Sequence, residues 1–159
     1  MILGMDTLTF IHVLLSLIGI FSGFVVLFGM FAARRLDSWT AIFLITTVAT
    51  SVTGFFFPFH GVTPGIVIGV LSLLLLALAI LARYPLHLAG GWRKMYVITA
   101  VFALYFNVFV LVVQAFEKAP ALRAIAPHMS DPPFIVAQTV VMVLFIVWGI
   151  QAVRKFREQ

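Results

Sequence analysis

Histidine and carboxylate side chains gather toward one end of this chain's apolar segments, and these residue types together are suited to holding a metal ion. Three of the four histidines and three of the five acidic residues belong to the group: His12, His60, His128, Asp6, Glu117 and Asp131. Imidazole and carboxylate groups are common ligands of transition metals, and the thioethers of Met5 and Met129 would suit reduced copper. The pattern predicts a transition-metal site formed by the three histidines, with Asp131 or Met129 as a further ligand.

A b-type haem held by two histidines is a second possibility, and it comes from the helical spacing around His12. This residue falls about one turn or more inside the first apolar segment, where a polar side chain normally faces the bundle interior. Two stripes of small or polar residues reach the same level: His12, Ser16, Gly19 and Gly23 in the first segment, and Thr46, Thr50, Thr53 and Phe57 in the second. One further turn of the second stripe reaches His60. Gly19 and Gly23 would leave room for the flat macrocycle.

The same residues also have an explanation without a ligand. His12 would then hydrogen-bond a neighbouring helix, His60 would cap a helix end, and His128 would be a solvated loop residue. The spacing Gly19-x-x-x-Gly23 is a close-packing pattern of membrane helices, within a bundle or between protomers of a homo-oligomer. The residues leave these alternatives open.

Three amide side chains extend the predicted polar interior formed by Thr46 and Thr50. Asn107 and Gln114 are seven residues apart and so share one helical face, and Gln138 falls at a depth close to that of Gln114. Unpaired amides are costly in hydrocarbon, so we expect these groups to hydrogen-bond across helices. They would serve either as contacts between helices or as a polar path or quinone-type carbonyl contact.

Long apolar segments must position all of these groups. Of the 159 residues, 64% are hydrophobic and only 9% are charged, whereas a soluble domain has about a quarter of its residues charged. Five segments have the approximate length needed to cross a bilayer as a helix, and they cover residues 7–33, 39–57, 64–82, 94–116 and 133–153. The sequence predicts an all-α integral membrane protein of one domain, 1–159, with five transmembrane helices. A short interfacial helix is expected at 119–126.

The basic residues predict the orientation of the bundle. Eight of the ten Lys and Arg residues fall on one side of the predicted spans, and only Lys118 and Arg123 fall on the other. The side rich in Lys and Arg normally faces the cytoplasm. We therefore expect the N-terminus outside and the C-terminus in the cytoplasm. The net charge of +5 is explained by this topology, and no basic patch is large enough to indicate nucleic-acid binding.

Several classes of function are disfavoured by what the chain lacks. It has no cysteine, which excludes thiolate metal sites and thiol redox chemistry. It has no nucleophile elbow and no Gly-rich phosphate loop, so enzymatic chemistry has little support. None of the five predicted spans carries Lys, Arg, Asp or Glu in its middle third. Ion-coupled transporters normally place such a group at mid-depth, so active transport is disfavoured.

Three runs give the chain a family resemblance: His12-Val-Leu-Leu-Ser-Leu-Ile-Gly-Ile-Phe-Ser-Gly23, Ser51-Val-Thr-Gly-Phe-Phe-Phe-Pro58 and Asp131-Pro-Pro-Phe-Ile-Val-Ala-Gln138. The chain resembles a set of small multi-pass bacterial inner-membrane proteins to which no activity is attached. The resemblance implies a bacterial inner membrane, and it implies no cofactor or site residue.

The sequence therefore predicts a binding or accessory protein of the inner membrane, with a periplasm-facing polar site for haem or a metal ion such as copper. One alternative is a structural or assembly subunit of a larger membrane complex. Another is an oligomeric channel or small-molecule transporter that uses the polar faces around Thr46, Thr50, Asn107 and Gln114.

Overall fold

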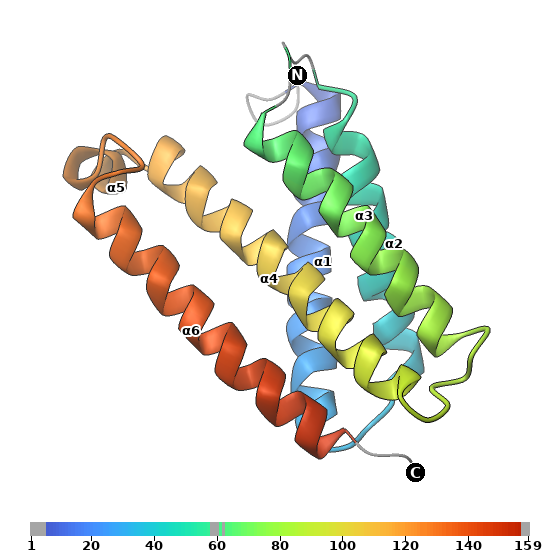
Figure 1. The fold of residues 1–159 in the computed structure, drawn as a ribbon. Coiled ribbons are helices and arrows are strands. Elements are labelled where there is room, and N and C mark those ends of the chain that lie inside the picture. The colour runs from blue at the N-terminus through green and yellow to red at the C-terminus, as the bar shows by residue number, and fades with distance from the viewer. Residues whose placement is uncertain (1–5, 58–60, 62, 157–159) are drawn as a thin grey trace.

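Helices are the only regular secondary structure in the part of the chain that the computed structural model describes, residues 6–57, 61 and 63–156 (Figure 1). In chain order they are α1 (Thr7–Phe31), α2 (Asp37–Gly54), α3 (Pro64–Arg83), α4 (Trp92–Lys118), α5 (Pro120–Ile125) and α6 (Pro132–Lys155). The all-α prediction is confirmed. The expected short helix in the last connection is present as α5.

Within the described residues, four helices are long and apolar enough to cross a membrane, namely α1, α3, α4 and α6. The helix α2 is not among them, because its 18 residues include Asp37 and five threonines. The prediction of a multi-pass membrane protein is thus supported by four helices.

Helix ends differ from the predicted spans by a few residues. The helix α1 ends at Phe31 because the chain turns there: Ala33 is left-handed, with φ of 55°, and the backbone N–H of Arg34 donates to the Gly29 carbonyl at 2.8 Å. The helix α2 lies two to three residues N-terminal of the predicted span. Conversely, α3, α4 and α6 continue into charged residues such as Arg83 and Lys118. Lys118 is exposed, and a long charged side chain at a helix end can reach the interface; Arg83 is instead buried.

Capping side chains fix where two of the helices begin. The backbone N–H of Thr9 donates to Oδ1 of Asp6 at 2.7 Å, and this hydrogen bond holds the pKa of the Asp6 carboxyl below its usual value. At α3, the backbone N–H of Ile66 donates to Oγ1 of Thr63 at 3.3 Å, and Pro64 occupies the first turn. Both caps satisfy backbone donors that a helix start leaves without an intrahelical partner.

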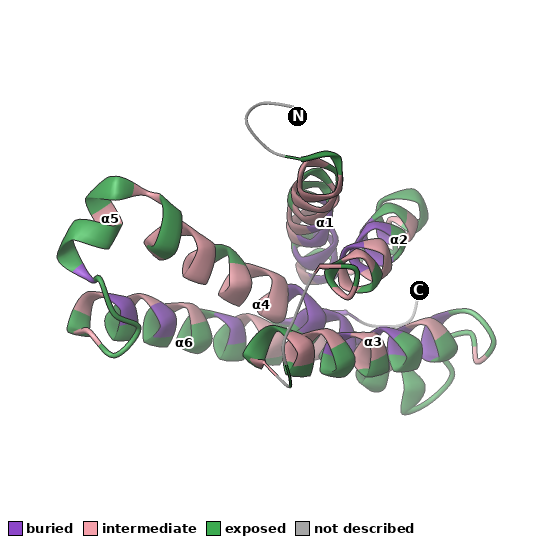
Figure 2. Ribbon diagram, turned by 90° about the horizontal axis from the view of Figure 1, so that it is seen from above, coloured by how far each residue is buried: buried purple, intermediate pink, exposed green. Residues whose placement is uncertain are grey.

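The core lies toward one end of the bundle. We call this the inner end, where α1 connects to α2 and α3 connects to α4, and we call the end with α5 the outer end (Figure 1). The buried residues of α1 fall between Gly19 and Met30, and those of α4 between Tyr96 and Leu104. Every residue of α4 from Tyr105 onward is half-buried or exposed. Toward the outer end, α4 and α6 lean away from α1, α2 and α3, as Figures 1 and 2 show.

Candidate functional site

His12 is hydrogen-bonded across α1 and α2. Its Nδ1 lies 2.9 Å from Oγ1 of Thr53, and its ring packs edge-on against Phe57 with centroids 5.2 Å apart. The Thr53 hydroxyl donates its single proton to the Thr50 carbonyl at 3.1 Å. In the tautomer that fits this bond, Nδ1 of His12 donates to Thr53 and the lone pair of the neutral ring is on Nε2. The expected hydrogen bond from His12 to a neighbouring helix is confirmed.

The two glycines of the first stripe serve close packing. A Cβ at Gly23 would lie 2.6 Å from Cδ1 of Leu104 and 2.9 Å from Cε1 of Phe43. A Cβ at Gly19 would lie 3.1 Å from Oγ1 of Thr47. The remaining cavity beside Gly23 measures about 10 Å³, which is room for about one water molecule. The space that the haem prediction required beside these glycines is occupied by side chains of α2 and α4.

The threonine stripe of α2 faces inward, as expected. Thr46 and Thr50 are buried, and their hydroxyls donate to backbone carbonyls one turn earlier, Ile42 and Thr46, at 2.6 and 2.8 Å. Thr47 is fully buried as well, although the stripe did not include it. The hydroxyls of Thr46 and Thr50 already donate to carbonyls within α2. The main role of the stripe is therefore to pack α2 against its neighbours.

Two of the three amide side chains, those of Asn107 and Gln138, form the expected hydrogen bonds across helices. Nδ2 of Asn107 donates to Oγ1 of Thr47 at 3.5 Å, a long and weak bond between α4 and α2. Nε2 of Gln138 donates to the Phe109 carbonyl at 3.1 Å and so joins α6 to α4. Gln114 is half-buried, and the hydrogen bonds that amide side chains form between α4 and other helices among the described residues are those of Asn107 and Gln138. The Oε1 atom of Gln138 is buried and lacks a partner among the described atoms.

The predicted metal ligands do not gather in the part of the chain that is described. No three His, Asp or Glu side chains form a group there that could hold a metal ion. His12 belongs to α1, whereas His128 lies on the connection from α5 to α6, on another side of the outer end (Figure 1). Asp131 closes that connection, because its Oδ2 accepts from the backbone N–H of His128 at 2.8 Å. His60 lies outside the described residues, so its role stays a prediction.

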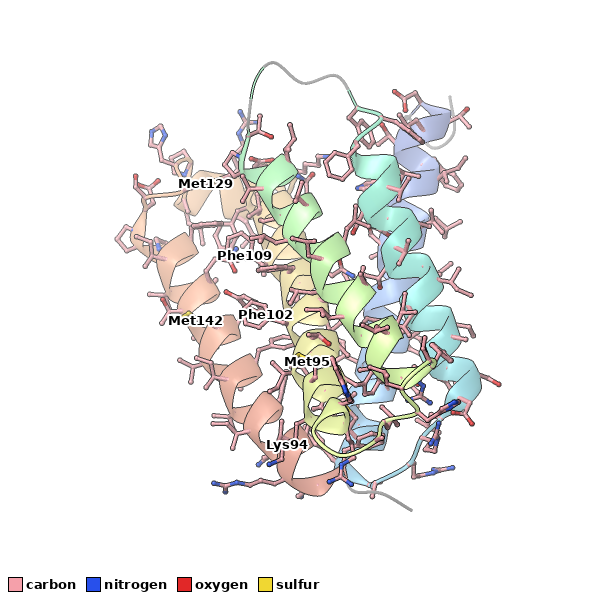
Figure 3. All side chains as sticks on the ribbon, turned by 45° about the vertical axis from the view of Figure 1, so that its right-hand side comes forward. Lys94, Met95, Phe102, Phe109, Met129 and Met142 are labelled. Atoms are coloured by element: carbon pink, nitrogen blue, oxygen red, sulfur yellow. The ribbon has the colours of Figure 1, made fainter. Side chains whose placement is uncertain are left out.

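A cavity of about 300 Å³ lies at the outer end between α4, α5 and the start of α6. Its lining combines apolar and polar side chains: Val113, Phe116, Glu117, Arg123, Ala126, Pro127, His128, Met129 and Phe134. The rings of Phe116 and Phe134 meet edge-on with centroids 5.4 Å apart, and Phe134 is buried. Figure 3 shows Met129 at this end, with Phe109, Phe102 and Lys94 following α4 toward the inner end. This cavity is the candidate site.

The sequence did not indicate this cavity, since it depends on how α5 folds back between α4 and α6. Only His128 and Met129 of its lining belonged to the predicted metal ligands. A usable signal was present in the connection, where Arg123 is one of only two basic residues on the outer side and follows Glu117 by six positions. Two opposite charges close to Phe116 and Phe134 are consistent with an apolar pocket whose opening carries polar side chains.

A second polar cluster, at the inner end, was also missed. The Arg83 guanidinium is almost fully buried, with 2% of the residue exposed, and its Nη2 donates to Oδ1 of Asp37 at 2.6 Å and to the Arg35 carbonyl at 3.1 Å. It also lies over the Tyr96 ring, 5.1 Å from the centroid. Its Nε and Nη1 have no partner among the described atoms. The cluster ties α2, α3 and α4 together.

The fold and site define a class: an all-helical protein with four helices suited to crossing a membrane and a cavity at one end of the bundle. Comparisons with protein-family models, with curated proteins and with solved structures found no match to this chain.

Proposed function

We propose that this chain is a multi-pass protein of the bacterial inner membrane that binds a small amphipathic molecule in the cavity between α4, α5 and α6. In this proposal α2 is a fifth span, the N-terminus is outside and the C-terminus is in the cytoplasm. The excess of Lys and Arg at the inner end supports this orientation. The cavity would then open near the periplasmic surface of the membrane.

The observation that carries the proposal is the two-sided lining of the cavity. Val113, Phe116 and Phe134 offer an apolar wall, and the mouth carries polar side chains from Glu117, Arg123 and His128. A volume of about 300 Å³ is at the lower end of the range for small-molecule sites, which usually combine apolar walls with a few polar groups. A ligand with an apolar body and a polar head would satisfy both sides.

Filling the cavity should weaken binding of the amphipathic ligand. We expect Val113→Trp to lower labelling by a phospholipid with a diazirine beside its headgroup about tenfold, since losing this fit costs about 1.4 kcal/mol or more. The measurement is mass-spectrometric mapping of labelled peptides in nanodiscs. Phe102→Trp is the matched control, because Phe102 is exposed on the same helix at 46%. Equal labelling of wild type and Val113→Trp around Phe116 would contradict the proposal.

His12 supports a second candidate function, ligation of copper or of a haem b bound away from Gly19 and Gly23, where side chains fill the space. The observation in its favour is the Nε2 lone pair that the bond to Thr53 leaves available. If it ligates haem, the purified protein should show a Soret band that shifts on reduction with dithionite, and His12→Ala should lose it. His87→Ala, at an exposed histidine of the inner end, should keep it. A featureless spectrum together with no copper by elemental analysis would rule out this candidate.

A further inference from the structure

We propose that the cavity selects a zwitterionic phospholipid headgroup that carries a primary ammonium, as phosphatidylethanolamine does. This inference rests on the proposed function and specifies its ligand. Glu117 would accept hydrogen bonds from the ammonium, and Arg123 would donate to the phosphate. Val113 and Phe116 would contact the first part of the apolar chains.

The charges of the lining carry the inference. Glu117 lies in the last turn of α4 and Arg123 lies in α5, and both line the same cavity. Neither side chain forms an ion pair within 4 Å of a described residue, unlike Asp37, which pairs with Arg35 and Arg83. Two opposite charges therefore line one cavity without a direct ion pair between them.

Ligands of a single charge fit this arrangement poorly. An anionic headgroup would bind Arg123 but would also lie close to the Glu117 carboxylate, whereas a simple cation would leave Arg123 without a partner. A headgroup in which an ethylene linker joins a phosphate to an ammonium offers one partner to each side chain. Hydrogen bonds between charged partners are shorter and stronger than neutral ones, so both ends would contribute to selection.

The aromatic residues of the lining favour a primary over a quaternary ammonium. Quaternary ammonium groups are usually recognised by the faces of aromatic rings. Here Phe116 and Phe134 pack edge to face against each other, and Phe134 is 8% exposed. Among the described residues of the lining, these are the only two phenyl rings, and they pack against each other rather than side by side as a cage. A primary ammonium can donate N–H hydrogen bonds to the Glu117 carboxylate, whereas a choline can attract it by charge alone.

The membrane setting favours a phospholipid over a soluble phosphoamine as the source of this headgroup. The neighbouring helix surface is apolar and exposed, with Ile125 at 58%, Ile135 at 49% and Val136 at 60%. A lipid can keep its chains in the bilayer beside these residues while its headgroup enters the cavity.

Native mass spectrometry of the full chain in detergent, supplied with matched phosphatidylethanolamine, phosphatidylcholine and phosphatidylglycerol, tests the inference. We expect wild type to retain phosphatidylethanolamine about tenfold better than the other two, the effect of one charge-assisted hydrogen bond. Glu117→Gln should abolish the preference over phosphatidylcholine, and Arg123→Gln should weaken all three lipids. Lys118→Gln, which removes a neighbouring charge outside the lining, should change nothing.

Other outcomes are equally decisive. Equal retention of the three lipids, or an unchanged preference in Glu117→Gln, would overturn the inference. If such unselective binding were still blocked by Val113→Trp, the proposed function would stand while the headgroup assignment fell. Competition by soluble phosphoethanolamine as strong as that by the lipid would also overturn the assignment to a phospholipid.

Discussion

Asp37→Asn should destabilise the protein by about 2 kcal/mol, although Asp37 itself lies at the surface. Its carboxylate is the counter-ion of the Arg83 guanidinium, which is 2% exposed and has two further nitrogens without partners among the described atoms. Removing one partner of a buried pair costs about 3–5 kcal/mol. The Asp37 side chain is 75% exposed, so solvent screening reduces the expected effect.

A double-mutant cycle separates this effect from simple loss of a surface charge. Arg83→Met replaces the buried charge with an apolar side chain and should recover most of the stability lost in Asp37→Asn. Arg35→Gln is the control, since Arg35 contacts the same carboxylate at 3.5 Å from an exposed position. The measurement is thermal unfolding in detergent, and an effect of Asp37→Asn no larger than that of Arg35→Gln would contradict the prediction.

Gly23→Ala should destabilise the bundle by about 1–3 kcal/mol, the usual cost of overpacking a filled core. The added Cβ would lie 2.6 Å from Cδ1 of Leu104 and 2.9 Å from the Phe43 ring, and both neighbours are 1% exposed. The cavity that these side chains share with Gly23 measures only about 10 Å³, so they can move little and α1 must shift away from α2 and α4.

Two further variants test the reason for that loss. Gly23→Ala should cost less stability in a Leu104→Ala background than in wild type, because the clash with Leu104 is removed. Gly149→Ala is the matched control, since its Cβ would lie 3.6 Å from Cγ1 of Val101, an ordinary contact. It should be neutral or slightly stabilising, as alanine favours helix. If thermal unfolding ranked Gly149→Ala below Gly23→Ala in stability, the packing argument would be wrong.

Helical spacing was sufficient to predict which faces of α1 and α2 meet. His12 and Gly19 lie two turns apart on one face of α1, and Thr46 and Thr50 lie one turn apart on α2. In an apolar membrane segment, a stripe of polar or small residues normally faces the bundle interior. Their contacts in the structure agree with this prediction. The helices themselves were predicted from a different feature, the length of the apolar segments.

The cavity and the Arg83 cluster did not follow from the sequence. In a membrane helix both faces are apolar, so the pattern of α6 does not indicate how it turns toward α4, and the cavity depends on that rotation. Arg83 was counted with the basic residues that set topology, since a charge at a helix end usually reaches water. Its burial depends on the start of α2, where Leu36 is left-handed with φ of 46° and Asp37 comes within reach of α3.

The spreading of the helices toward the outer end has a mechanical consequence for the surrounding bilayer. Figures 1 and 3 show a bundle that is broader at the end with α5 than at the end with Lys94. With the proposed orientation, such a wedge displaces more lipid from the periplasmic leaflet than from the cytoplasmic one. That imbalance is relieved where the periplasmic leaflet is convex, so the protein should be enriched in strongly curved regions such as the cell poles.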